Sequence, residues 1–407
     1  MLGKTQYLYP INDTVTEILT DSAHSPSSRI KSLDILRGAA IIGVITVHIM
    51  FGMGRGVDGD VAAGFNVAEL VYAGLPMFMV ITGYFYRSGR RYIDNVKHRV
   101  VPVILVLIIS TVFLTSIMYG YMWVLGYDLS NYDLFNDIMT IIIGKECFNT
   151  IGVDGFTAGA VLAPYDISAG YYYLQILTVG LLIFYAIADH VLDDWRKTVT
   201  AIFALLSMTA LYLELVNIQL PFSAQLGPVV ASFLLLGALM GRYNVANFIE
   251  NGYHERKYWL IFGAFIIAAV ASVILFPSGM NLYNSKFGAN GALSVFTFLF
   301  LSITCGAVLW YITALLIKVP VVSAIFTYAG LNSIILFTQH MFVAKLITAP
   351  FYTLGTKYWV TVDSIGMRFV ILMVTLGLLF GMCHFLHRLR NDVPEETADD
   401  DTTYASR

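Results

Sequence analysis

The sequence predicts an all-α fold, a bundle of about ten transmembrane helices that leaves both termini in the cytoplasm. Of its 407 residues, 57% are hydrophobic and 13% are charged, and the mean hydropathy is +0.72. A soluble protein of this length needs more charge to cover its surface, so lipid is the expected solvent for most of the chain. Apolar segments recur along the whole sequence, and the Lys and Arg residues between them are biased to one side.

Ten apolar segments approach the length of about 20 residues that a helix needs to cross a bilayer. The polar stretch 1–30 precedes them and contains no short apolar segment that ends in a cleavage site, so we expect the first span to be retained. The ten segments lie at about 35–53, 68–86, 101–124, 169–188, 199–216, 226–241, 258–276, 292–317, 322–346 and 365–386.

The distribution of Lys and Arg predicts the orientation, because these residues are retained on the cytoplasmic side. With the N-terminus inside, about three quarters of the 24 Lys and Arg residues fall in cytoplasmic segments. An even number of spans then returns the C-terminus to the cytoplasm. The cations left outside are Arg55, Lys145, Lys286, Lys345, Lys357 and Arg368.

Three regions follow from this topology. The segment 1–30 is cytoplasmic, residues 31–390 form the membrane domain, and the acidic stretch 391–407 is expected to be a disordered cytoplasmic tail because it is too polar to bury. The longest loop, about 125–167, faces outside and mixes aromatic with carboxylate side chains. This mixture suits a sugar-like acceptor, and it equally suits a solvated cap over the bundle.

Composition says less about partners. The three cysteines show no disulfide framework and no metal-type spacing, so we expect no metal site. The net charge of −3 is uninformative, because charge in a membrane protein matters by its location. Membrane lipids are the expected surroundings, and nucleic acid is not an expected partner.

The first predicted span carries three ionisable side chains, Asp34, Arg37 and His48. At 100° per residue, the angle between Arg37 and His48 is about 20°, and Asp34 lies about 60° from Arg37. All three therefore share one helix face. The rise of the helix puts His48 about 16 Å deeper in the membrane than Arg37. We expect Asp34 to pair with Arg37 and to hold its guanidinium in place.

An ionisable group at the depth of His48 is costly unless it faces protein or water, which makes it a candidate functional residue. His is also the side chain best suited to move a proton near neutral pH. The alternative is a structural His that is bonded to a neighbouring helix. Asp34 and Arg37 on the same face favour the functional interpretation.

A dense group of cations follows the second span on the predicted inner side. It could neutralise the phosphates of a nucleotide-containing donor such as coenzyme A. Anchoring by the positive-inside rule is the alternative explanation. The candidate donor-binding residues in this group are Arg87, Arg90, Lys97 and Arg99.

The ninth span contains a second candidate pair, Ser333 and His340. They are seven positions apart and so share a helix face. His340 either contacts the donor or the acceptor, or is a packing residue with a satisfied hydrogen bond.

Four stretches, taken in order, resemble the acyltransferase 3 family of integral membrane acyltransferases. The first, RIKSLDILRGAAIIGVITVH, resembles the family's Leu-Asp-x-x-Arg-Gly start and its pairing of an Arg with a later His, which fall on Arg37 and His48. The second, LPMFMVITGYF, resembles a Phe-x-x-Ser-Gly-Phe stretch with Thr82 in place of Ser. VKHRVVP resembles a basic run ending in Pro, and GLNSIILFTQHMF resembles the late Ser and His stretch. The resemblance covers about residues 29–390.

One departure concerns the cations. The family often shows Arg-x-x-Arg before that Pro, and here Arg99 fits the second position while Val96 occupies the first. Either Lys97 or His98 substitutes, or the pair Arg87 and Arg90 supplies the charge from upstream.

The resemblance implies transfer of an acetyl or other short acyl group from cytosolic acyl-coenzyme A to a hydroxyl of an envelope polysaccharide, lipid-linked sugar or related acceptor. It implies a multi-pass protein of the plasma membrane without a bound cofactor or metal, for which acetyl-CoA or another acyl-CoA is a substrate. We expect His48 to act as general base on the acceptor hydroxyl or as a covalent carrier of the acyl group. The alternative function is a transporter or flippase of a lipid-linked sugar, which intramembrane charge and a long outside loop also suit.

Overall fold

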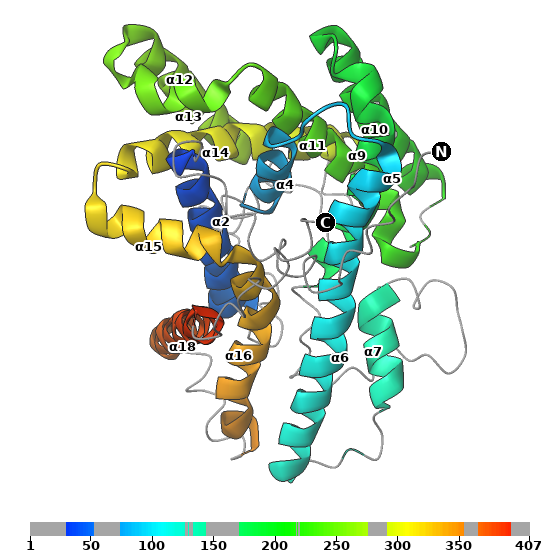
Figure 1. Ribbon diagram of the computed structural model, residues 1–407, viewed down its shortest axis with the longest axis vertical. Coiled ribbons are helices and arrows are strands. Elements are labelled where there is room, and N and C mark those ends of the chain that lie inside the picture. Colours follow the sequence, from blue (N-terminus) through cyan, green and yellow to red (C-terminus); the bar gives the residue numbers. More distant parts are fainter. Residues whose placement is uncertain are drawn as a thin grey trace, which may run out of the picture.

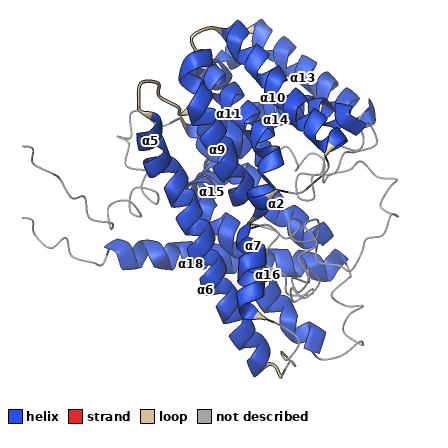
Figure 2. Cartoon of the chain, turned by 90° about the vertical axis from the view of Figure 1, so that its right-hand side faces the viewer, coloured by secondary structure: helices blue, strands red, loops and turns tan. Residues whose placement is uncertain are grey.

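The computed structural model describes residues 30–52, 74–126, 129, 133–143, 171–216, 218, 220–275, 291–353 and 365–391. These residues form helices and short connections, and no strand occurs among them (Figure 2). The all-α fold predicted from the sequence is therefore confirmed. The predicted ends 1–29 and 392–407, and most of the loop 125–167, lie outside the described residues.

The helices follow the predicted spans closely. Eight of them are long and apolar enough to cross a membrane, and a bent pair of helices makes a ninth candidate span within the described residues. The helices are α2 (Lys31–Gly52), α4 (Gly74–Tyr84), α5 (Tyr92–Asn95), α6 (Val101–Val124), α7 (Leu134–Ile143), α9 (Tyr172–Val191), α10 (Trp195–Leu215), α11 (Gly227–Arg242), α12 (Val245–Asn251), α13 (Arg256–Leu275), α14 (Ser294–Leu316), α15 (Pro320–Leu331), α16 (Ser333–Thr353) and α18 (Ile365–Asn391).

Two predicted elements differ in detail. The second span was expected over 68–86, and its described part, α4, is a shorter apolar helix of 11 residues. The predicted outside loop contains a helix, α7, which packs against α6 and α9. Inside that contact the buried Asp137 carboxylate accepts a hydrogen bond from the Tyr119 hydroxyl.

The prediction of one continuous helix over 322–346 is wrong. The chain bends by 83° between α15 and α16, and Asn332 lies at the break with non-helical backbone angles (φ −100°, ψ 15°). The Asn332 side chain donates a hydrogen bond to the Tyr328 carbonyl at 2.9 Å. Such local side-chain bonding competes with the helical hydrogen-bond ladder for backbone acceptors. Hydropathy averaged over the span does not register this event.

Helix α2 lies in the middle of the helices that form the candidate site (Figure 1). It contacts α4, α14, α15, α16 and α18. Its buried residues Leu36, Ile41, Ile45 and Ile49 are almost without solvent exposure. The first predicted span is therefore surrounded by protein over much of its surface, as the cost of its ionisable side chains requires.

Glycines let α15 cross α2 with the two backbones in contact. A Cβ atom on Gly38 would overlap the carbonyl oxygen of Phe326, and one on Gly330 would overlap the carbonyl oxygen of Asp34. Small residues at membrane helix contacts permit this close approach, which increases the dispersion attraction between the helices.

A second pair, α4 and α11, packs in the same way. Gly237 and Gly241 are four positions apart on α11, and a Cβ on either would overlap a carbonyl oxygen of α4, at Val80 and Tyr84 respectively. Gly83 of α4 faces the backbone of α11 at Leu234. This arrangement matches the Gly-x-x-x-Gly pattern of packed transmembrane helices.

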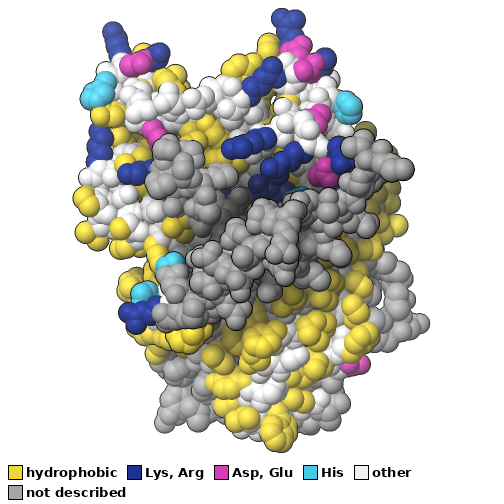
Figure 3. Space-filling model, viewed as in Figure 1, with side chains coloured by type: hydrophobic (Ala, Val, Ile, Leu, Met, Phe, Trp, Pro, Cys, Tyr) yellow, Lys and Arg dark blue, Asp and Glu magenta, His cyan; other side chains and the backbone are white. Residues whose placement is uncertain are grey.

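The outer faces of several helices are apolar. Ile109 and Phe113 on α6, Ile267 on α13 and Met373 on α18 are all exposed. Hydrophobic side chains cover much of the lower part of the view in Figure 3, whereas most of the visible Lys and Arg side chains gather in its upper part. Apolar faces of this kind suit contact with lipid.

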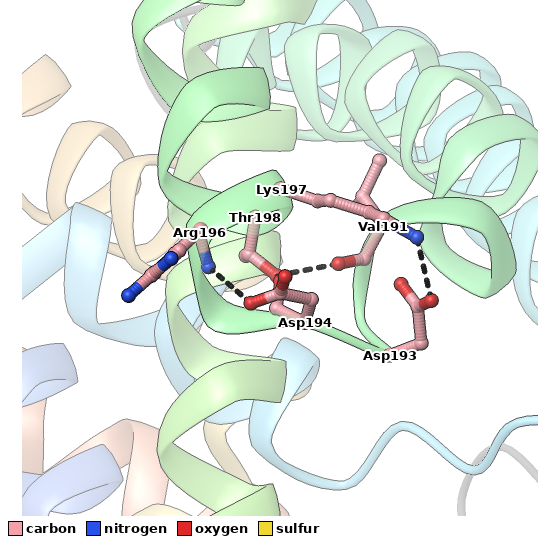
Figure 4. Close-up of polar contacts among 6 residues, drawn as sticks. All are labelled: Val191, Asp193, Asp194, Arg196, Lys197 and Thr198. Atoms are coloured by element: carbon pink, nitrogen blue, oxygen red, sulfur yellow. Dashed lines mark hydrogen bonds and ion pairs between the residues drawn. The ribbon is translucent and has the colours of Figure 1, made fainter.

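The turn between α9 and α10 is fixed by its own polar side chains (Figure 4). Asp194 caps α10, because its carboxylate accepts a hydrogen bond from the Arg196 backbone N–H at 2.9 Å. Thr198 donates to the Val191 carbonyl at 2.8 Å, which links the two helix ends. The hydrogen bond from Lys197 to Asp193, 2.7 Å long, lowers the pKa of that exposed carboxyl group.

Candidate active site

The two intramembrane histidines that the sequence singles out are in direct contact. His48 Nδ1 on α2 lies 2.8 Å from His340 Nε2 on α16, and the planes of the two rings differ by only 5°. The ring centroids are 5.0 Å apart, which is the separation of two imidazoles that meet edge to edge through one hydrogen bond. His340 is fully buried and His48 is half-buried.

The other nitrogen of His340 is also bonded. Its Nδ1 lies 2.7 Å from the carbonyl oxygen of Phe337, one turn earlier on the same helix. Both ring nitrogens of this buried side chain are therefore paired, as expected for a polar group away from water. The chain of contacts runs from the backbone of α16 through His340 to His48.

The end of α2 that carries His48 is held by α18. Arg368 Nη1 donates a hydrogen bond of 2.6 Å to the carbonyl oxygen of Met50. This carbonyl is one of the last four of α2, which have no partner within the helix. A cation is also favourable at the negative end of the helix dipole. This contact was not predicted, since Arg368 was placed among the outside cations.

A chain of aromatic side chains connects His340 with α9 and α4. The rings of Phe337 and His340 have centroids 5.9 Å apart, and the Phe337 and Tyr173 centroids are 5.0 Å apart. Phe78 of α4 lies 6.3 Å from Tyr173. The Tyr171 hydroxyl donates to the Thr338 carbonyl at 3.2 Å, which fixes the start of α9 against α16. The histidine contact therefore lies against a packed apolar wall.

Arg37 and Asp34 lie on the same continuous helix as His48, in agreement with the predicted helical spacing. Both are half-buried. The positive charge of Arg37 interacts electrostatically with the Tyr173 hydroxyl of α9.

The predicted donor cations lie at the surface. Arg87 is exposed in the connection after α4, and Lys97 and Arg99 are exposed on a π-helical turn, Val96–Val100, just before α6. Pro102 provides no N–H for the carbonyl of His98, which favours a wider turn at this point. Such π-turns are frequent at functional sites.

Arg90 lines an open pocket of about 530 Å³. Arg91, Asp189 and His190 also line it, the last two from the end of α9. Arg91 is paired with Asp94 at 3.3 Å. Next to this pocket the Tyr86 hydroxyl donates to Asp189 at 2.7 Å. Burial, together with this hydrogen bond, raises the pKa of Tyr86 above its usual value.

The comparison with protein families bears on all of these residues. The model of the acyltransferase 3 family, described as an acyltransferase domain, matches residues 30–384. The chain belongs to the acyltransferase 3 family. The match covers most of the chain, and the resemblance found in the sequence is confirmed. No curated protein and no solved structure matches this sequence.

As a member of this family the protein is a membrane acyltransferase, which favours an enzyme over the alternative of a transporter or flippase. Both histidines, Arg37 and Asp34 fall inside the matched range. Within the described residues, no group of three or more His, Cys, Asp or Glu is arranged to hold a metal ion.

The structure unites some of the candidate residues of this acyltransferase and leaves others apart. His48 and His340 are in contact, whereas Ser333 is the first residue of α16 and makes no hydrogen bond to either histidine among the described residues. Tyr173 and Arg368 did not figure among the candidates. The run of three tyrosines at 171–173 was the signal in the sequence for Tyr173, because a buried tyrosine hydroxyl usually finds a hydrogen-bond partner.

Proposed function

We propose that this membrane acyltransferase is an O-acyltransferase of the plasma membrane that uses cytosolic acyl-CoA, with acetyl-CoA as the expected donor. The acceptor is a hydroxyl of an envelope polysaccharide, a lipid-linked sugar or a related glycan. The observation that carries the proposal is the contact between His48 and His340, because it holds a proton-accepting side chain at a fixed position inside the membrane domain.

In the proposed step His48 takes the proton of the acceptor hydroxyl as the oxygen attacks the thioester carbonyl. The C–O bond forms and a tetrahedral oxyanion results. The C–S bond then breaks, and the leaving thiolate takes the proton back from His48. The products are the ester and free coenzyme A. In the second route a ring nitrogen of His48 attacks the thioester carbonyl, and the C–S bond breaks to release coenzyme A as a thiolate. The acceptor hydroxyl then takes the acyl group from His48 and its proton goes to the thiolate. Both routes need the same unprotonated ring nitrogen.

The donor is an anion, and the cations of the site support its binding. Arg37 is the cation nearest to the histidines along α2, and its charge interacts electrostatically with Tyr173. Arg90, with the exposed Arg87, Lys97 and Arg99, provides a positively charged surface for the phosphates of coenzyme A. No bound cofactor is needed for acyl transfer by this route.

Membranes from cells that express the protein provide a direct test. They are incubated with acetyl-CoA that carries ¹⁴C in the acetyl group, and the label in the glycan and lipid-linked sugar fractions is measured. We expect label that mild alkali releases, since esters are cleaved under conditions that leave amides intact. His48→Gln membranes with the same amount of protein should incorporate about 10²- to 10⁴-fold less.

The wild-type arm and the variant arm report on different parts of the proposal. Absence of label with both acetyl-CoA and longer acyl-CoA donors would contradict acyl transfer from coenzyme A. Equal label in wild-type and His48→Gln membranes would remove His48 from the chemistry. Alkali-stable label would identify an amide product and overturn the hydroxyl acceptor.

A further inference from the structure

We infer that His340 is a positioning residue that fixes the tautomer of His48, so that the Nε2 atom of His48 is the one that exchanges the proton or carries the acyl group. This inference rests on the proposed function, since it specifies which atom of His48 acts. It follows from two contacts, one at each nitrogen of His340.

The first contact fixes the proton of His340. The carbonyl oxygen of Phe337 can only accept a hydrogen bond, so the Nδ1 atom 2.7 Å away must carry the hydrogen. A neutral imidazole carries one N–H, and its other nitrogen has a lone pair. Nε2 of a neutral His340 is therefore an acceptor.

The second contact passes this assignment to His48. Its Nδ1 atom lies 2.8 Å from the acceptor Nε2 of His340 in nearly the same plane, so His48 Nδ1 must carry the hydrogen of this bond. The lone pair of neutral His48 is then on Nε2. Among the described residues no group forms a hydrogen bond with that atom.

The neutral form of His340 is favoured by its surroundings. The ring is fully buried, and its two hydrogen-bond partners are a carbonyl group and another imidazole, neither of which is an anion. A buried charge without an opposite partner is costly, so the pair holds two neutral rings in the resting state.

The same contact stabilises the charged state that forms during the reaction. When Nε2 of His48 takes the proton of the acceptor hydroxyl, the positive charge spreads over the ring and strengthens the bond from Nδ1–H to the lone pair of His340. His340 keeps its own proton on Nδ1, held by the Phe337 carbonyl. A third group thus orients the base, an arrangement that is effective in other acyl-transfer sites.

Nitrogen NMR of the protein in lipid nanodiscs tests the inference without any substrate. The protein is labelled with ¹⁵N at its eight histidines, and the signals of His48 are those that disappear in His48→Gln. We expect a protonated, pyrrole-type Nδ1 and an unprotonated, pyridine-type Nε2 for His48 near neutral pH. An imidazole free in water prefers the opposite tautomer, so this result requires a partner at Nδ1.

Two replacements of His340 and one control separate positioning from packing. His340→Phe keeps a ring but removes the acceptor, and it should release the tautomer of His48 and lower kcat about 10- to 100-fold with little change in the KM for acyl-CoA. His340→Gln offers a side-chain oxygen as acceptor, so it should partly restore the tautomer of His48 and partly restore kcat. As the control, Tyr171→Phe removes a buried hydrogen bond to the carbonyl of Thr338, two residues before His340, and should leave the tautomer of His48 unchanged.

The outcomes distinguish this inference from the proposed function. A protonated Nε2 in wild-type His48, or a tautomer that does not respond to His340→Phe in folded protein, would overturn the positioning role even if acyl transfer is confirmed. If the tautomer behaves as expected while wild-type membranes transfer no acyl group, the proposed function fails and the assignment of the two rings stands.

Discussion

Two helix pairs in this acyltransferase pack backbone against backbone through glycines, and they serve different ends. Where α4 meets α11, Gly83, Gly237 and Gly241 bring together helices whose contact is apolar. Where α2 meets α15, Gly38 and Gly330 achieve the same closeness, but Arg37 adjoins Gly38 and the helix break at Asn332 follows Gly330. The same packing of glycines against a backbone therefore either closes a core or positions reacting groups, depending on the side chains beside it.

Replacement of the base itself should have the largest effect. His48→Gln removes the proton acceptor but leaves the α2–α15 contact intact, so turnover should fall about 10²- to 10⁴-fold while the folded protein persists. Initial rates with acyl-CoA in nanodiscs measure turnover, and size-exclusion profiles measure the amount of folded protein. Aggregation of the variant would show that the α2–α16 contact is required for folding as well.

Removal of the Arg37 charge, which adjoins Gly38, should weaken binding of the acyl-CoA donor. Arg37→Gln should raise the KM for acyl-CoA about 10- to 100-fold, because hydrogen bonds to charged groups contribute about 1.5–3 kcal/mol. The KM for the acceptor should change far less. Arg37→Lys keeps the charge but lacks the planar pair of donors, so its KM for acyl-CoA should lie between those of wild type and Arg37→Gln. An unchanged KM for acyl-CoA in Arg37→Gln would exclude Arg37 from donor binding.

The two glycine contacts can be compared directly through matched substitutions. Gly38→Ala and Gly237→Ala each force a methyl group onto a carbonyl oxygen, and overpacking of this kind costs about 1–3 kcal/mol. Both should lower the midpoint of thermal unfolding in detergent. Only Gly38→Ala should also lower kcat of the folded fraction, because it shifts α15 and with it α16. Equal loss of kcat in both variants would erase the distinction between the two contacts.

The α9–α10 turn provides the smallest expected effect. Asp194→Ala removes the cap of α10 and should cost about 1 kcal/mol of stability. This turn makes none of the contacts of the histidine site, so kcat and both KM values should stay at the wild-type level. A clear fall in kcat would mean that the turn is coupled to the site through α9.

The membrane fold could be predicted because a helix in lipid must be long, apolar and internally hydrogen-bonded. That constraint acts locally, so segments such as 199–216 and 258–276 were found nearly as the structure has them. The bend at Asn332 was missed because it lies in the backbone angles and local hydrogen bonding of one residue, on which hydropathy does not report.

The site was predictable in part for the same reason. Arg37 and His48 lie on one helix, and helical geometry alone relates them. His340 was a candidate, but its partner was not predictable, because the two histidines are 292 positions apart in the sequence and the contact depends on the direction of α16 after the break. Arg368 was read as one of the outside cations for a similar reason, since its bond to Met50 joins distant spans.

A double-mutant cycle on turnover tests most directly whether His340 works through His48. Turnover is measured for wild type, His48→Gln, His340→Phe and the double variant at equal amounts of folded protein. If His340 acts only by orienting His48, His340→Phe should lower kcat in the wild-type background and change nothing further in the His48→Gln background. Losses that multiply in the double variant would show two independent roles and contradict the account.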